Sequence, residues 1–176
     1  MAGRAGRAHN PEEAARRVRL LLLDVDGVLT DGGLYVLPGG GEAVRFDVRD
    51  GLGLVRARQE GLAVGFVSGR STDAVRARAA ELGVEEVHLG VKDKATVLAA
   101  ILSRRGLTPE EVCYVGDDLP DIPVLEAVGL PVTVPEAPDE VVDAAAYVTR
   151  HPGGRGAVRE VVDFVLRARS GASEGA

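Results

Sequence analysis

Residues 18–32, VRLLLLDVDGVLTDG, decide how the rest of this chain is interpreted. The stretch opens with a short apolar run that has the length and composition of a strand buried on both faces. The run stops at Asp24, and Asp26 follows in a loop that contains glycine. Because ligands of open α/β sheets bind beyond the carboxyl ends of the strands, these two carboxylates are candidate functional groups. Aspartate and glycine are also common in ordinary turns, so the interpretation needs support from elsewhere in the chain.

Two carboxylates one residue apart can do two different jobs. Side chains alternate between the two sides of an extended segment, so Asp24 and Asp26 need not point the same way. One of them can meet a metal and a substrate while the other faces a leaving group. Such hard oxygen ligands suit Mg²⁺, which typically takes one or two carboxylates together with other oxygens and water.

Strand-like and helix-like segments alternate along the remainder of the chain. We expect further strands at residues 62–67, 86–89, 112–115, 131–134 and 147–148. We expect helices near residues 49–60 (with Asp50 as N-cap), 72–82, 92–105, 121–128, 139–145 and 156–168, and a single turn at 108–111. This alternation predicts an α/β fold, a Rossmann-like three-layer sandwich in which helices cover both faces of a central parallel sheet.

A projecting β-hairpin flap is predicted at about residues 33–48. Two short β-prone segments there flank the glycine-rich turn PGGG at residues 38–41. An exposed hairpin that carries Tyr35, Val36 and Phe46 is an edge that favours covering by another subunit. The interval between Asp24 and Ser68 holds only this hairpin and one helix, so we expect no cap domain.

The chain is expected to form one domain, at residues 18–169. Residues 1–17 are interpreted as a disordered tail and a short helix that Asn10 and Pro11 open. A C-terminal tail is expected over residues 150–176, with residues 170–176 frayed.

Composition excludes several classes of protein. A net charge of −6 with scattered basic residues argues against a general nucleic-acid binder. The longest pure apolar run is residues 20–23, so no membrane span is predicted, and the N-terminal basic residues lack the apolar segment of a signal peptide. The single cysteine, Cys113, is interpreted as a buried thiol, which fits a reducing cytoplasm.

Polar side chains recur where the predicted strands end. Ser68 and Arg70 follow the second strand, and Lys94 begins the helix after the third. After the fourth strand come three acids, at Asp117, Asp118 and Asp121. In a parallel sheet all these ends lie at one edge, where they would form an acidic cluster that needs a divalent cation. Carboxylates, Mg²⁺, a lysine and a serine around one point are what phosphoryl transfer requires.

A mechanism follows from these parts. Asp24 is the candidate nucleophile, which attacks phosphorus to give an aspartyl phosphate. The Mg²⁺ would be held by Asp24, by the backbone carbonyl of Asp26 and by Asp117. Asp26 would protonate the leaving alkoxide and then deprotonate the attacking water.

The remaining polar residues would support this chemistry. Ser68 and Lys94 would hold the equatorial phosphoryl oxygens. Asp118 and Asp121 would orient Lys94 and metal-bound water.

The motifs DVDGVLTDG, SGR, KDK and GDDLPD, in this order, resemble those of the haloacid dehalogenase superfamily of phosphatases. More narrowly, FDVRDGLGL, the short flap and the closing HPGGRGAVREV resemble the phosphatases of 3-deoxy-D-manno-octulosonate 8-phosphate (KDO 8-phosphate). The resemblance implies a capless, Mg²⁺-dependent homotetramer that hydrolyses this sugar phosphate in lipopolysaccharide precursor synthesis. In that family the hairpins and C-terminal tails of neighbouring subunits close each site.

The resemblance also implies substrate contacts. They would involve Asp26, Asp47, Val48, Arg49, Asp50, Gly51, Gly69, Arg70, Arg78 and Lys94. Arg49 and Arg70 suit a substrate that carries a carboxylate and a phosphate. Arg155 is expected to reach a neighbouring subunit's site, because its glycine-rich segment would be flexible. Relatives carry a basic residue where this chain has Val55, so one sugar contact is expected to be missing.

Three alternatives stay open at this point. One is a phosphatase for a nine-carbon ulosonate 9-phosphate or another sugar phosphate. A second is a phospho-receiver signalling module, against which the acid two residues after Asp24 argues. A third is a non-catalytic assembly domain, which the intact set of Asp24, Asp26, Lys94 and Asp117 disfavours.

Overall fold

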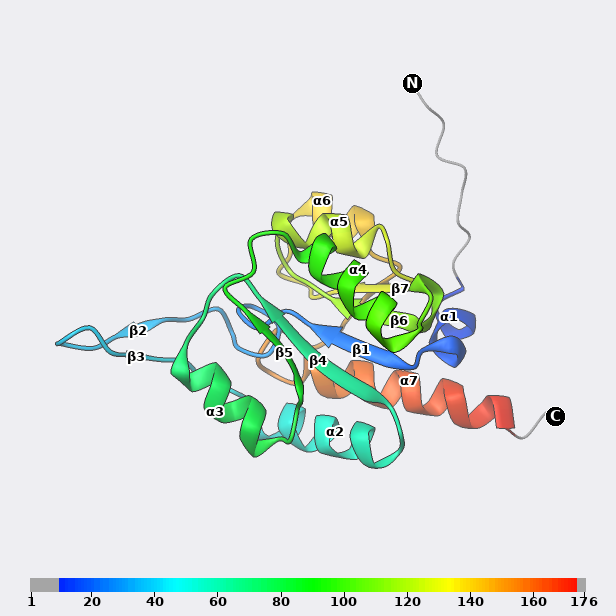
Figure 1. The fold of residues 1–176 in the computed structure, drawn as a ribbon, viewed down its shortest axis with the longest axis horizontal. Helices are drawn as coiled ribbons and strands as arrows, with labels where there is room; N and C mark the ends of the chain where they lie inside the picture. Colours follow the sequence, from blue (N-terminus) through cyan, green and yellow to red (C-terminus); the bar gives the residue numbers. More distant parts are fainter. Residues whose placement is uncertain (1–9, 174–176) are drawn as a thin grey trace, which may run out of the picture.

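The computed structural model describes residues 10–173, and its centre is a six-stranded parallel sheet (Figure 1). The strands lie in the order β5-β4-β1-β6-β7-β8. Their bounds are β1 (Leu20–Leu23), β4 (Ala63–Ser68), β5 (Glu86–Leu89), β6 (Val112–Val115), β7 (Leu130–Thr133) and β8 (Tyr147–Val148). Every neighbouring pair in this sheet is parallel, as the alternation of strands and helices predicted.

Helices cover both faces of the sheet (Figure 1). One layer consists of α1 (Pro11–Arg17), α2 (Val48–Gln59), α3 (Asp73–Glu81) and α7 (Ala157–Ser173). The other layer consists of α4 (Lys94–Arg105), α5 (Ile122–Leu125) and α6 (Asp139–Ala144). Two 3₁₀ turns, at Pro109–Glu111 and Leu119–Asp121, complete the helical segments. The predicted three-layer α/β sandwich is confirmed, and within residues 10–173 no segment forms a cap domain.

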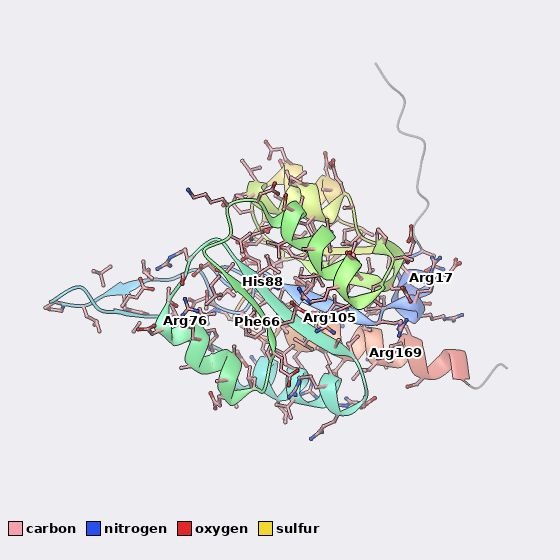
Figure 2. All side chains as sticks on the ribbon, viewed as in Figure 1. Arg17, Phe66, Arg76, His88, Arg105 and Arg169 are labelled. Carbon is pink, nitrogen blue, oxygen red and sulfur yellow. The ribbon has the colours of Figure 1, made fainter. Side chains whose placement is uncertain are left out.

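The four leucines of β1 show why this strand is central. Leu21 and Leu23 pack into the core beneath α1, α2, α3 and α7, whereas Leu20 and Leu22 pack against the opposite layer. All four are completely buried, so each contributes roughly 1.5–3 kcal/mol of apolar burial. Side chains fill the space on both sides of the sheet, including that of Phe66, which is labelled in Figure 2 and packs in the same core as Leu21.

The register of the strands aligns their carboxyl ends. Leu23 is paired with Phe66 of β4 on one side and with Val115 of β6 on the other. The connection after β1 leads to β4 on one side of this strand, and the later strand β6 lies on its other side. This reversal of strand order creates a crevice of the kind in which α/β sheets bind ligands. Asp24 directly follows β1, and its backbone N–H donates to the carbonyl of Val115 at 2.9 Å.

The predicted flap is an antiparallel hairpin of β2 (Tyr35–Val36) and β3 (Glu42–Ala43). It projects away from the body of the molecule (Figure 1). Four consecutive apolar side chains on it are exposed, Leu34, Tyr35, Val36 and Leu37.

The N-terminal boundaries differ from the sequence-based expectation. Ala14 and Ala15 of α1 are buried in the core, so this helix belongs to the packed body that was expected to begin at Val18. The expected disordered tail before Asn10 lies outside the described residues. Asp50 does not cap α2, because the helix begins earlier, and Asp47 accepts from the Arg49 N–H as N-cap instead.

The C-terminal half differs in two places. The helix expected at residues 121–128 is only α5, preceded by a 3₁₀ turn. Fraying from Ser170 is wrong as far as Ser173, because α7 continues to that residue. Among residues 10–173, no helix combines the length and apolar character needed to cross a bilayer.

Candidate active site

A cavity of about 450 Å³ opens at the carboxyl edge of the sheet, beside β1, β4 and β6. Its lining residues are Asp24, Asp26, Gly27, Gly32, Gly69, Arg70, Val91, Lys92, Lys94, Asp117, Asp118, Pro120 and Asp121. Five carboxylates thus face three cationic side chains. The cavity has a surplus of negative charge, although a phosphate ester is itself an anion.

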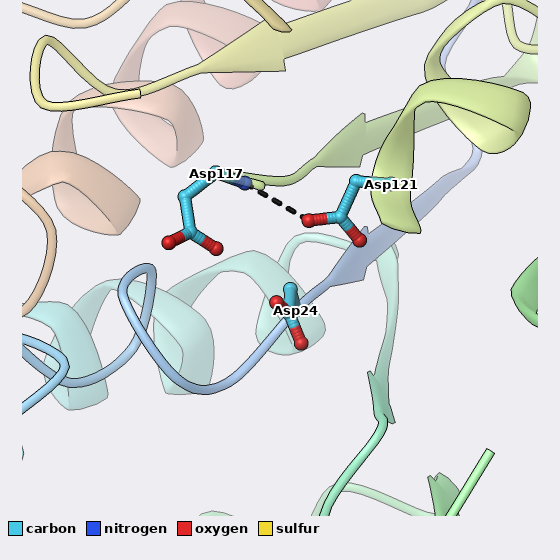
Figure 3. Close-up of side chains that lie close together, drawn as sticks. All are labelled: Asp24, Asp117 and Asp121. Atoms are coloured by element: carbon cyan, nitrogen blue, oxygen red, sulfur yellow. Dashed lines mark hydrogen bonds between the residues drawn. The ribbon is translucent and has the colours of Figure 1, made fainter. Parts of the chain in front are cut away.

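Three of these carboxylates converge on one point (Figure 3). Asp24, Asp117 and Asp121 each offer an oxygen, and these atoms all lie within 4.8 Å of one another. Burial raises the pKa of Asp117, and the charges of Asp24 and Asp121 raise it further. Burial also raises the pKa of Asp24, with Asp121 adding to the rise and Lys94 opposing it. The positive charge of Lys94 therefore does not balance the negative charge of the three acids.

A divalent cation fits this arrangement. Oδ1 of Asp117 is buried and has no hydrogen-bond partner within the described part of the chain, so a ligand position is left open. Carboxylate oxygens are the ligands that Mg²⁺ prefers, and a cation here would offset the repulsion among the acids. Asp24 and Asp117 are the side chains best placed to hold it.

Asp121 has a different task from the other two acids, because hydrogen bonds occupy both of its oxygens. Oδ1 accepts from Lys94 Nζ at 2.7 Å and from Tyr114 Oη at 2.6 Å. Oδ2 accepts from the backbone N–H groups of Asp117 (3.0 Å; Figure 3) and Asp118 (3.2 Å). Asp121 therefore fixes both the loop that carries Asp117 and the position of Lys94.

Lys94 lies between two carboxylates at the first turn of α4. Its Nζ is 3.0 Å from Asp24 Oδ1 and 2.7 Å from Asp121 Oδ1. Burial by itself lowers the pKa of Lys94, but the charges and hydrogen bonds of Asp24 and Asp121 outweigh it and raise the pKa. The buried lysine therefore stays charged beside Asp24, where an attacking carboxylate would meet phosphoryl oxygens.

Asp24 and Asp26 have different surroundings, as the alternation along an extended segment allows. Asp24 is buried and contacts Lys94, and its Oδ1 accepts from the Val25 N–H at 2.7 Å. Asp26 is one-third exposed and contacts Arg70, with 3.3 Å between Oδ1 and Nη1. The inner carboxylate thus belongs to the acidic cluster, and the outer one is the more exposed of the two in the cavity lining.

Gly27 and Thr30 shape the loop that carries these acids. A Cβ at Gly27 would lie 2.0 Å from Asp117 Oδ2, and the backbone there has φ of +83°, so only glycine fits. The buried hydroxyl of Thr30 accepts from the N–H groups of Gly27 and Gly32. The loop is therefore held in shape before any ligand binds.

Sequence reasoning missed three contributors to this site. Tyr114, Gly27 and Thr30 were interpreted only as parts of an apolar run or a motif. The signal available was the hydroxyl of Tyr114 within an otherwise apolar strand, since a buried tyrosine hydroxyl needs a hydrogen-bond partner.

Two other predicted residues, Ser68 beside the cavity and Asp118 in its lining, have hydrogen-bond partners within the protein. Ser68 is buried at the end of β4, where its Oγ accepts from the Arg70 N–H at 3.2 Å, and it does not line the cavity. Asp118 is exposed and accepts from the Leu119 N–H at 2.8 Å, so its carboxylate caps the 3₁₀ turn and makes no contact with Lys94.

The residues around the start of α2 do not line the cavity. They are Asp47, Val48, Arg49, Asp50 and Gly51. The carboxylate of Asp50 accepts from the N–H groups of Gly156 and Arg159, because it lies buried under the start of α7. Asp47 caps α2 and pairs with Arg49 at 3.2 Å.

Arg78 and Arg155 also have partners away from the cavity. The guanidinium of Arg78 lies over the ring of Phe46, 5.7 Å from its centroid, and pairs with Glu81. Arg155 lies 3.5 Å from Asp31 of its own chain. Both arginines thus have partners within this subunit, and their expected substrate roles stay predictions.

The sheet and the carboxylates at its edge define a haloacid dehalogenase-like hydrolase, and the sequence profile of that family matches residues 86–161. The 3-deoxy-D-manno-octulosonate 8-phosphate phosphatase KdsC of Escherichia coli K12 is 45% identical over 155 residues, which cover 88% of this chain and 82% of the relative. The Yersinia pestis protein of the same name is 41% identical over 157 residues, covering 89% and 84%. This chain belongs to the family of KDO 8-phosphate phosphatases.

Solved structures agree with this assignment. The phosphatase from Moraxella catarrhalis, in complex with magnesium, phosphate and KDO, superimposes with a TM-score of 0.90 at 34% identity, covering 95% of this chain and 96% of that one. The cobalt-bound phosphatase from Haemophilus influenzae has a TM-score of 0.86 at 36% identity, covering 92% and 95%.

Proposed function

We propose that this chain is a Mg²⁺-dependent phosphatase that hydrolyses KDO 8-phosphate to KDO and phosphate. The observation that carries the proposal is the convergence of Asp24, Asp117 and Asp121 beside Lys94. Relatives at 41–45% identity bear this activity in their name, and the Moraxella catarrhalis protein binds magnesium, phosphate and KDO. The open oxygen of Asp117 supports the need for a cation.

The first half of the reaction uses Asp24 and Lys94. The carboxylate of Asp24 attacks phosphorus, forming an O–P bond as the bond to the sugar oxygen breaks. Lys94, 3.0 Å from Asp24, keeps positive charge where phosphoryl oxygens collect it. Asp24, Asp117 and the backbone carbonyl of Asp26 would hold Mg²⁺, which would supply charge that offsets the repulsion between carboxylate and phosphate.

Asp26 takes part in both halves. In the first half its carboxyl group donates a proton to the sugar oxygen as the bond to phosphorus breaks. In the second half its carboxylate accepts a proton from the water that attacks phosphorus, and the bond between Asp24 and phosphorus breaks to release phosphate. The partial exposure of Asp26 in the cavity lining supports this role, because its carboxyl group can meet both the leaving group and solvent water. Ser68 belongs to the proposal as a phosphoryl contact, because its oxygen accepts from the Arg70 N–H and its own O–H can still donate to a phosphoryl oxygen.

Phosphate release from sugar phosphates tests this function. We expect Mg²⁺-dependent release from KDO 8-phosphate, none in the presence of EDTA, and a loss of at least about 10³-fold in Asp24→Asn. The Glu60→Ala variant, which removes an exposed ion pair with Arg56 on α2, should keep full activity. Faster release from a nine-carbon ulosonate 9-phosphate would show that this compound is the substrate. Retained activity in Asp24→Asn would show that Asp24 is not the nucleophile.

We also propose that the chain works as a homotetramer in which hairpins contact neighbouring subunits. Exposed apolar side chains on the hairpin and on α2 support this, including Val36 (76% exposed), Val48 (81%) and Leu52 (61%). Light scattering should give four times the mass of the chain, and Val36→Lys should lower that mass. A wild-type monomer at micromolar concentration would contradict the proposal.

A cytoplasmic location is proposed as well. The lone Cys113 is completely buried, and burial raises the pKa of its thiol, so it stays an unreactive core group that fits a reducing compartment. Cell fractionation with antibody against the chain tests the location.

A further inference from the structure

Arg70 joins the predicted catalytic acid to the flap. Its Nη1 lies 3.3 Å from Oδ1 of Asp26, and its Nη2 lies 2.6 Å from Oε2 of Glu42. Glu42 belongs to β3 of the hairpin, whereas Arg70 follows β4 in the sheet. A single guanidinium thus connects the cavity with a segment that otherwise projects from the body.

The contacts of Glu42 contribute little to the stability of the fold. Its Oε1 is buried and has no hydrogen-bond partner among the described residues. A buried, unsatisfied carboxylate oxygen is unfavourable, and an ion pair as exposed as Glu42 (29%) and Arg70 (40%) contributes little to stability. Stabilisation of the hairpin therefore does not account for this arrangement.

The contact with Glu42 limits how Arg70 can approach Asp26. Arginine and a carboxylate prefer a bidentate pair, in which two N–H groups contact both oxygens. Because Glu42 takes Nη2 at 2.6 Å, Arg70 reaches Asp26 only through Nη1 and at the longer distance of 3.3 Å. The contact uses one oxygen of Asp26, so the other remains available to exchange a proton with the leaving group and with water.

We propose that Glu42 is a positioning residue for this reaction. It holds Arg70 in a one-point contact with Asp26, which orients the acid without forming a closed, bidentate pair. Without Glu42 the guanidinium turns both of its N–H groups to Asp26 and blocks proton transfer. The inference rests on the proposed phosphatase activity, in which Asp26 exchanges the proton.

Kinetics of Glu42 variants test the proposal. Glu42→Ala should lower kcat roughly tenfold, a fraction of the 10²–10⁴-fold that acid–base catalysis contributes, with KM changed less than about twofold. Glu42→Gln keeps an acceptor oxygen at the same reach and should recover most of kcat. The matched control is Glu60→Ala, which removes a Glu–Arg pair of similar exposure outside the cavity.

The double variant decides whether Glu42 acts through Arg70. On an Arg70→Ala background, Glu42→Ala should have no further effect, since there is no guanidinium left to misplace. Additive losses, an unchanged kcat in Glu42→Ala, or a fall in kcat that Glu42→Gln does not recover would overturn the proposal. If the wild-type chain releases no phosphate from KDO 8-phosphate, the proposed substrate fails, and the same variants are measured with the phosphomonoester that the screen identifies.

Discussion

The chain has two glycine-rich segments, residues 39–41 at the tip of the hairpin and residues 153–156 before α7, that look alike in sequence but not in structure. Nothing lies within 4 Å of the Cβ positions of Gly39 and Gly40. A Cβ at Gly153, by contrast, would lie 1.8 Å from the Gly27 carbonyl oxygen, and one at Gly154 would lie 2.3 Å from the Asp31 nitrogen. Glycine permits a turn in the first segment and close packing in the second.

The second segment supports the loop that carries Asp24 and Asp26. Gly154 N–H donates to the Val28 carbonyl at 2.8 Å, and the Gly154 carbonyl accepts from Arg45 at 2.7 Å. The expected flexibility of this segment is therefore wrong, because its backbone is packed against the loop that carries Asp24 and Asp26. The comparison teaches that glycine content alone does not separate a mobile tip from a tightly packed support.

The largest expected effect comes from adding one methyl group at Gly153, in the segment that packs against the loop of Asp24 and Asp26. Gly153→Ala should destabilise the protein by roughly 3 kcal/mol and reduce kcat strongly, because the Cβ displaces Gly27 and with it Asp26. Gly41→Ala is the matched control: neither glycine has a positive φ, but a Cβ at Gly41 meets only Leu37 at 3.7 Å. Gly41→Ala should change stability by less than about 0.5 kcal/mol.

Urea unfolding and phosphate release measure both variants. Equal effects of Gly153→Ala and Gly41→Ala would contradict the comparison, since they would mean that the loop of Asp24 and Asp26 moves aside without loss of stability.

Glu160 anchors the same support from α7. Its carboxylate accepts from Tyr147 Oη at 2.6 Å, and from the N–H groups of Arg150 and His151 at 3.1 Å each. The ring Nδ1 of His151 lies 2.6 Å from it as well. Burial by itself raises the pKa of Glu160, but these hydrogen bonds outweigh it and lower the pKa from 4.5 to about 2.

A smaller effect, and one that depends on pH, is expected from Glu160→Gln. The variant should be less stable by about 2 kcal/mol at neutral pH, because a neutral amide replaces an ionised carboxylate that accepts several hydrogen bonds. The folded-state pKa lies below the unfolded one, so the stability from ionised Glu160 is complete above about pH 4.5 and disappears as pH falls toward 2. The melting temperatures of the two proteins, measured at pH 7, 4 and 2.5, should therefore converge at low pH. A constant difference would show that the ionised form of Glu160 does not stabilise the protein.

The smallest expected effect is a difference in amide hydrogen exchange. Residues 153–154 should exchange slowly and residues 39–41 rapidly, because only the former have packed surroundings. Added Mg²⁺ should slow exchange further at residues 24–32 and 153–154 by relieving repulsion between Asp24 and Asp117, with no change at the hairpin tip. Slowing at the hairpin tip instead would show that the flap responds to the cation more than the support does.

Much of the fold could be predicted because its signals are local. The apolar run of β1, the glycine that ends α4 at Gly106 and the capping box at Thr108 are each readable within a few residues. The strand ends follow from this pattern, and with them the meeting of Asp24, Lys94 and Asp117 at one edge of the sheet. The substrate contacts could not be read in this way, as Asp50 shows, because its carboxylate serves the start of α7.

The sequence by itself determined the order of strands and helices, and which acids follow β1 and β6. Hydrophobic periodicity and helix capping depend on residues close together in the chain, so both can be recognised in the sequence. Only the tertiary structure decided that Tyr114 and Asp121 fix Lys94, that Glu42 meets Arg70, and that Gly153 lies against Gly27. Most of these contacts join segments far apart in the chain, and packing of the whole core sets their distances.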